Sequence, residues 1–100
     1  MRFSGLLILL FLVGTTTAQK HKSYYENGKL KEQGKFKKGQ PAGKWIYYYE
    51  NGEIELQGKF KKGAKEGEWN SFWPSGRLFE TGQWKDGNEV GEWTGFYVYS

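Results

Sequence analysis

The chain has 100 residues, of which 19% are aromatic and 15 are glycine, and it carries a formal net charge of +4 at pH 7. A chain of this length fits a single domain. It contains no cysteine, which excludes disulfide staples, thiol catalysis and thiolate metal sites, so we expect side-chain packing alone to hold the fold.

Residues 1–18 have the pattern of a secretory signal peptide. Met1 and Arg2 give a basic start, residues 6–13 are an apolar run, and residues 14–18 are small. The apolar run is far shorter than the roughly 20 residues of a membrane-spanning helix. We therefore expect a helical signal peptide that is cleaved between Ala18 and Gln19, with export to the periplasm or the outside. An uncleaved N-terminal anchor is the alternative, and the lack of cysteine excludes a lipid anchor.

The remainder, residues 19–100, repeats with a step of 24 residues. The units are 19–42, 43–66, 67–90 and a truncated 91–100. Self-similarity at a fixed period is typical of repeat architectures, so the repeat is the main guide to the fold. The first unit lacks the Gly-x-Trp opening and has His21 where the others have tryptophan. The recurring structural positions are Gly43, Gly67 and Gly91; Trp45, Trp69 and Trp93; Gly52 and Gly76; Gly58 and Gly82; Phe60 and Trp84; Gly63 and Gly87.

Each unit reads as a β-hairpin. Residues 44–49 are strong strand formers, and Asn51-Gly52 is typical of a two-residue type I′ turn. In the return strand, residues 54, 56, 58 and 60 alternate with polar residues, which predicts that they share one face. A looser turn is expected over 61–67. No sustained 3.6-residue apolar period occurs, so we predict an all-β protein in which tandem hairpins form an elongated antiparallel meander.

Glycines in the middle of a strand predict close backbone approach. Gly weakens a strand unless something must lie against its backbone. We expect the rings of Trp45, Trp69 or Trp93 to lie on such glycines, so that Gly58→Val harms stability more than a change at an exposed lysine.

The pattern Gly-x-Trp-x-x-Tyr-Tyr-x-Asn-Gly followed by Gly-x-Phe-x-x-Gly resembles the bacterial variant of the MORN repeat. Residues 43–66 match it best, 67–90 match with Trp73-Pro74-Ser75-Gly76 in the turn, and 19–42 match from Tyr24 onward. The resemblance implies a module for protein contacts or for association with acidic phospholipid, and some bacterial relatives carry an antitoxin-like label. It implies no catalytic residue.

Candidate catalytic and metal-binding groups are few. His21 is the only histidine and is predicted to be exposed, and a metal site would need several convergent ligands. Glu53 and Glu55 are predicted to lie on a solvated strand face. We therefore expect no enzyme activity, no metal and no cofactor.

Charge is uneven along the array. Without residues 1–18 the chain has 14 basic and 11 acidic residues, and the four units carry net charges of +5, +1, −2 and −1. This gradient suggests head-to-tail self-association, and the alternative is that these charges keep a small open sheet soluble. The lysines of residues 29–38 lie among aromatic residues, but export argues against nucleic acid as a partner.

Two functions from different classes follow. The first is an exported scaffold that binds a protein partner or an anionic envelope surface, and the alternative is a cell-surface carbohydrate-binding module that uses exposed aromatic rings. The residues predicted to make contact are Tyr47, Tyr49, Trp73, Tyr97, Lys35, Lys37 and Lys38.

Overall fold

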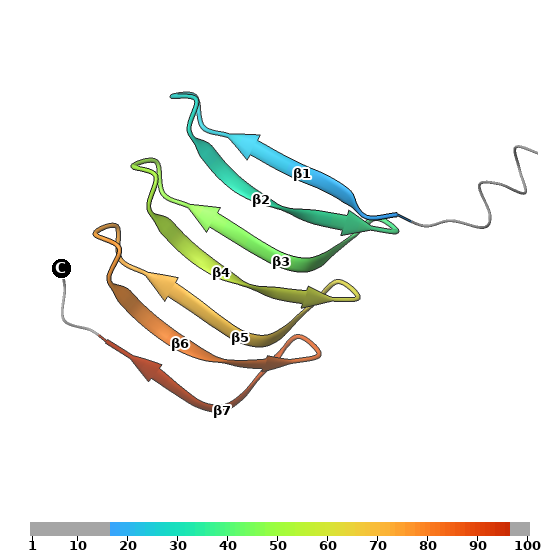
Figure 1. Ribbon diagram of the computed structural model, residues 1–100. Helices are drawn as coiled ribbons and strands as arrows, with labels where there is room; N and C mark the ends of the chain where they lie inside the picture. Colours follow the sequence, from blue (N-terminus) through green and yellow to red (C-terminus); the bar gives the residue numbers. More distant parts are fainter. Residues whose placement is uncertain (1–16, 97–100) are drawn as a thin grey trace, which may run out of the picture.

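The computed structural model describes residues 17–96, which form one antiparallel sheet of seven strands in sequence order (Figure 1). The predicted all-β hairpin meander is confirmed, and this range contains no helix. The signal peptide prediction concerns residues that lie almost entirely outside the described range. The strands are β1 (Gln19–Tyr24), β2 (Leu30–Lys37), β3 (Gln40–Tyr48), β4 (Ile54–Lys61), β5 (Ala64–Phe72), β6 (Leu78–Lys85) and β7 (Asn88–Gly95).

The hydrophobic core is a row of indole rings that lie on glycine backbone. Within the described residues, Trp45 and Trp69 are the buried hydrophobic side chains, with 3% and 2% of their surface exposed. A Cβ added to Gly58 would lie 2.0 Å from Cδ2 of Trp69, which shows that only glycine fits beneath the ring. The predicted close approach is thereby confirmed. It occurs in three pairs, Gly34 with Trp45, Gly58 with Trp69 and Gly82 with Trp93.

A β-bulge places each ring on its glycine. The β2–β3 register passes from Gln33↔Ile46 to Lys35↔Ala42, so the single residue Gly34 faces residues 43–45. Gly43 has φ +70°, a left-handed conformation that glycine adopts without a Cβ clash. Bulged strands bend, and β3, β5 and β7 curve near their first residues in Figure 1.

The two turn types occur in exchanged places. The two-residue turn was predicted at Asn51-Gly52 and the looser turn over 61–67. Asn51-Gly52 lies in a three-residue loop, because Gly52 N donates to Tyr49 O and only Gly52 of this loop has positive φ. The predicted looser turn contains the two-residue loop Lys62-Gly63, in which φ is +51° and +82°, as a type I′ turn requires. The type I′ prediction at Asn51-Gly52 was therefore wrong.

The alternation predicted for β4 is also interrupted. Tyr47 pairs with Leu56 whereas the next residue, Tyr48, pairs with Ile54, so Glu55 is an extra residue in β4. Tyr47 and Tyr48 point to opposite faces, and their partners do the same. Ile54 therefore does not share a face with Leu56, because the bulge changes the phase of the strand.

The two faces of the sheet carry different side chains. Trp45 pairs with Gly58 on what we call the tryptophan face, and Lys44 pairs with Lys59 on the other, the back face. From β1 to β7, the back face has three rows that run across the strands. The charged row is Lys20, Lys35, Lys44, Lys59, Glu68, Gln83 and Glu92; the polar row is Lys22, Gln33, Ile46, Gln57, Asn70, Thr81 and Thr94; the apolar row is Tyr24, Leu30, Tyr48, Ile54, Phe72, Leu78 and Phe96.

Candidate functional site

Two of the aromatic residues predicted to make contact with a partner join successive hairpins. The hydroxyl of Tyr49 donates to Phe72 O at 2.6 Å, and Trp73 Nε1 donates to Phe96 O at 3.3 Å. Both side chains are half-buried. Each side chain therefore caps a backbone carbonyl of the next hairpin, a structural role that sequence reasoning did not assign to it.

The other two predicted aromatic residues differ from these. Tyr47 is half-buried and its ring stacks on Trp45, with 6.1 Å between ring centroids. Tyr97 lies outside the described residues. Burial, and next the carboxylate of Glu32, raise the pKa of Tyr47 above 10.0. Burial, and next Glu55, raise the pKa of Tyr49 in the same way, so both phenols stay neutral at physiological pH.

The tryptophan face is a continuous aromatic layer. Edge-to-face ring pairs recur at the repeat step, with centroid distances of 5.2 Å for Phe36–Trp45, 5.1 Å for Phe60–Trp69 and 5.6 Å for Trp84–Trp93. Nζ of Lys65 lies 4.9 Å from the Trp69 ring centroid and 4.5 Å from that of Trp84. A small groove of about 150 Å³ lies here. Because Trp45 and Trp69 are buried, they offer no open ring to a sugar, and the groove does not favour the carbohydrate alternative.

The hydrogen bonds of the indole groups are not equivalent. Trp69 Nε1 donates to Lys59 O at 3.1 Å, and Trp45 Nε1 donates to Lys35 O at 3.1 Å. Trp93 Nε1 is buried and has no acceptor among the described residues. The third copy of the ring contact is thus less complete than the other two.

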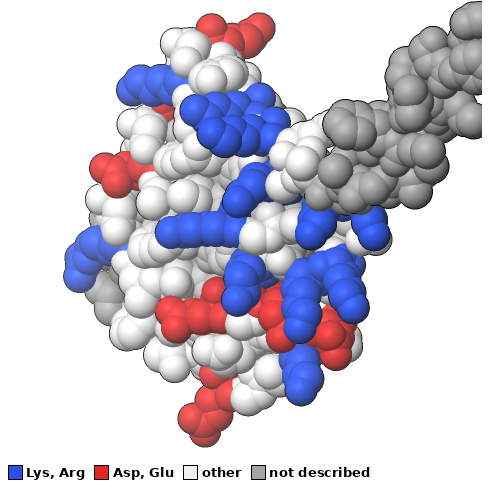
Figure 2. All heavy atoms as spheres, turned by 45° about the vertical axis from the view of Figure 1, so that its right-hand side comes forward, with Lys and Arg blue, Asp and Glu red and all other residues white. Residues whose placement is uncertain are grey.

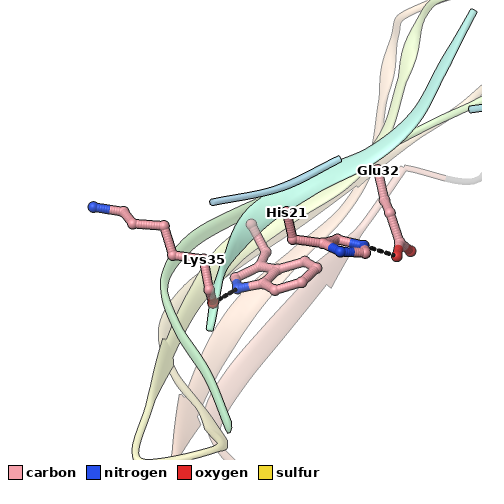
Figure 3. A network of polar contacts seen from close by, with 4 residues as sticks. His21, Glu32 and Lys35 are labelled. Atoms are coloured by element: carbon pink, nitrogen blue, oxygen red, sulfur yellow. Dashed lines mark hydrogen bonds and ion pairs between the residues drawn. The ribbon is translucent and has the colours of Figure 1, made fainter. Parts of the chain in front are cut away.

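His21 is part of the aromatic layer and not a free surface group. Its ring stacks on Trp45 with 5.4 Å between centroids, and its Nε2 lies 2.8 Å from Oε2 of Glu32 (Figure 3). The prediction of an exposed histidine was therefore wrong. It failed because the imidazole, at the repeat position of tryptophan, takes the place of an indole beside the neighbouring ring.

The lysines predicted to make contact divide between two places. Lys35 is exposed on the back face, and its side chain points away from His21 in Figure 3. It lines a shallow hollow of about 340 Å³ together with Lys20, Lys22 and Lys44. Lys37 and Lys38 lie instead at the two-residue turn between β2 and β3.

Turns of the same kind form one margin of the sheet, which we call the lysine rim. All its lysines are exposed, and Figure 2 shows basic side chains, in blue, projecting from the side that carries these turns. Sequence reasoning missed three of them, although they recur at the 24-residue step. The rim consists of Lys37, Lys38, Lys61, Lys62 and Lys85, and the acidic residues nearest to it in sequence are Glu66, Asp86 and Glu89.

Metal-ligand clusters and ion pairs are scarce among the described residues. Within 17–96, no cluster of three or more His, Cys, Asp or Glu side chains could bind a metal ion. Glu53 and Glu55 are exposed. The one ion pair in this part of the chain joins His21 to Glu32, so every lysine of the rim lacks a carboxylate partner. No helix suited by length and apolar character to crossing a membrane occurs in the same range.

Comparison with known proteins agrees with this geometry. The MORN repeat variant family matches residues 20–38, 42–62 and 65–86. Each match covers most of one repeat unit. No curated protein and no solved structure matches the chain. The three matches together span more than half of the chain, and the chain therefore belongs to the MORN repeat variant family.

Proposed function

We propose that this protein is an exported, non-catalytic interaction module whose lysine rim binds an anionic envelope surface. MORN repeats generally bind proteins or membrane lipids. The observation that carries the choice of an anionic surface is a set of five exposed lysines that form no ion pair with other residues of the range 17–96. They lie at three successive turns on one margin of the sheet.

The rim suits an extended anionic surface better than a compact ligand. Successive turns are two strands apart, which corresponds to about 9.5 Å in an antiparallel sheet. Lys62 and Lys38 each have positive φ at the same position of a type I′ turn, so the backbone holds both lysines at equivalent places. The lysines thus form a spaced line along the margin and do not converge on a pocket.

The energy of such an arrangement is sufficient for reversible binding. A lysine close to an anionic membrane contributes about 1 kcal/mol. Five lysines give an upper value of about 5 kcal/mol. Repulsion between the anionic surface and the carboxylates of Glu66 and Asp86 lowers this binding energy. The attraction weakens with salt, because the Debye length shrinks to about 8 Å at physiological ionic strength.

Vesicle co-sedimentation tests the proposal. Residues 19–100 should bind vesicles that contain phosphatidylglycerol, should not bind pure phosphatidylcholine, and should dissociate as salt is raised. A variant in which Lys37, Lys38, Lys61 and Lys62 become Gln should lose about 4 kcal/mol of binding free energy, close to a thousandfold in affinity.

A control variant with the same net charge separates the rim from charge in general. Lys20, Lys22, Lys29 and Lys31 belong to the first hairpin and lie outside the rim, and their change to Gln should reduce binding much less. Equal loss in both variants would show that total charge, and not the rim, determines binding. Export is tested separately, by N-terminal sequencing of the protein from its native host, which should begin at Gln19.

A further inference from the structure

No described residue covers the back face of the sheet, and the rows on this face differ in polarity. The apolar row includes Tyr24 and Phe96, which expose 57% and 46% of their surface and are two of the three exposed large hydrophobic residues of the described chain. The parallel charged row changes sign along the sheet, from lysine on β1 to β4 to glutamate on β5 and β7. A sheet with an apolar row on an open face normally buries it against a second layer.

We propose that a second copy of this chain is that second layer, and that two copies pack back face to back face around a twofold axis parallel to β4. This axis places β1 over β7, β2 over β6 and β3 over β5 of the partner. Each row then lies over the same row of the other copy, because residues of one row hold equivalent positions in the repeat.

The symmetry makes the charged row complementary to itself. Lys44 and Glu68 hold the same repeat position on β3 and β5, so each lies over the other residue of the second copy. Lys20 on β1 and Glu92 on β7 are related in the same way. The lysine end of the charged row in one copy therefore lies over the glutamate end of the same row in the other copy.

The apolar row is matched by the same operation. Tyr48 lies over Phe72, Leu30 lies over Leu78, and Ile54 of β4 meets its own copy on the axis. Aligned sheets cross at about 30°, so contact is closest near β4 and weaker toward the outer strands. The central pairs are thus the ones to test.

One contact is unfavourable in this dimer and therefore provides a specific test of it. Lys59 lies on β4 and meets Lys59 of the second copy on the axis. Its nearest carboxylate by register is Glu66, directly opposite on β5, but the two do not form an ion pair. Removing this lysine charge should therefore strengthen the dimer, which a general loss of basic charge would not predict.

This surface is separate from the lysine rim. The rim lysines lie at the two-residue turns, whereas the three rows lie farther along the strands, beginning at the bulges of residues 43–45 and 67–69. Head-to-tail joining would also bring the basic end of one sheet to the acidic end of the next. It is less favourable than the dimer, because β1 and β7 run in the same direction and would form a parallel pair in an otherwise antiparallel sheet. The dimer and the proposed binding to anionic surfaces can thus fail independently.

Sedimentation equilibrium of residues 19–100 tests the dimer. The wild type should form dimers, Lys44→Glu and Glu68→Lys should each weaken dimerisation at least tenfold, and the double variant should recover it because the exchanged charges attract again. Lys59→Gln should strengthen it. Lys62→Asp is the matched control, since Asp86 holds the equivalent turn position, and it should leave dimerisation unchanged.

Crosslinking gives a second readout that does not depend on charge. The chain has no cysteine, so Ile54→Cys introduces a single thiol, which a bismaleimide of about 10 Å should join across the axis at the usual spacing of packed sheets. Leu56→Cys, on the tryptophan face of the same strand, should not crosslink. A wild type that stays monomeric at all concentrations, a double charge variant that does not recover, or equal crosslinking of both cysteine variants would overturn the proposal.

Discussion

Substitution of Gly58 is the most direct test of the packing of indole on glycine. The Cβ of Gly58→Ala would lie 2.0, 2.2 and 2.4 Å from Cδ2, Cε2 and Cγ of Trp69. Real contacts of a Cβ are never this short, so either the indole or β4 must move. Trp69 is 2% exposed, so its displacement would expose a buried ring to water.

The expected loss of stability follows from what Trp69 would give up. Overpacking a filled site costs about 1–3 kcal/mol, and losing the buried ring altogether costs about 3–5 kcal/mol, as for Trp→Ala. Displacement also breaks the bond from Trp69 Nε1 to Lys59 O. We therefore expect Gly58→Ala to cost about 3 kcal/mol and Gly58→Val to cost more, against less than about 0.5 kcal/mol for Lys59→Ala at the exposed neighbouring position.

Chemical denaturation followed by tryptophan fluorescence measures these values, and a double-mutant cycle assigns the cause. If the clash acts through the indole, Gly58→Ala should cost little in a Trp69→Ala background, giving a coupling energy above about 2 kcal/mol between the two sites. Additive effects, or a Gly58→Val protein with the melting temperature of the wild type, would refute the reasoning.

Three further predictions concern single groups. Trp69→Phe removes a bonded indole N–H and should cost about 1 kcal/mol more than Trp93→Phe, whose N–H has no acceptor within residues 17–96; equal losses in urea melts would contradict this. The raised pKa of Tyr49 contributes stability that is complete below pH 10 and is lost as pH rises through the folded-state pKa, so Tyr49→Phe should flatten the alkaline decline of melting temperature. Lys62→Asn should raise stability by about 0.5 kcal/mol, because asparagine accepts the positive φ of a type I′ turn better than lysine, and thermal melts would show no gain if the turn were of another type.

The hairpin repeat and its core could be predicted from the sequence, because both depend on positions where few other residue types would fit. Only glycine leaves room for a ring such as Trp69, so the spacing of Gly58 and the tryptophans carries the packing. The turns were assigned in reverse because Asn51-Gly52 fits two loop lengths. A three-residue loop together with the extra residue Glu55 in β4 leaves Tyr47 paired with Leu56, as a two-residue loop without a bulge would. This pairing across strands is not visible in local composition.

The candidate site was predicted less well, for a related reason. Tyr49 and Trp73 have the exposed appearance of contact residues in sequence, yet their polar atoms bond to backbone of the next hairpin. His21 stands at a tryptophan position, but it was predicted to be exposed because its unit is terminal and degenerate. The lysine rim was found only in part, because Lys61 and Lys62 are adjacent to Lys37 and Lys38 only once successive turns lie side by side.

The position of each indole on a glycine eleven residues earlier bears on how such proteins change in copy number. A precise excision of residues 43–66 would bring Trp69 onto Gly34, a junction with the same partners as the two it replaces. The array could therefore lose or gain whole units by recombination without any new interface having to evolve. Stability would rise or fall in roughly equal increments with each unit.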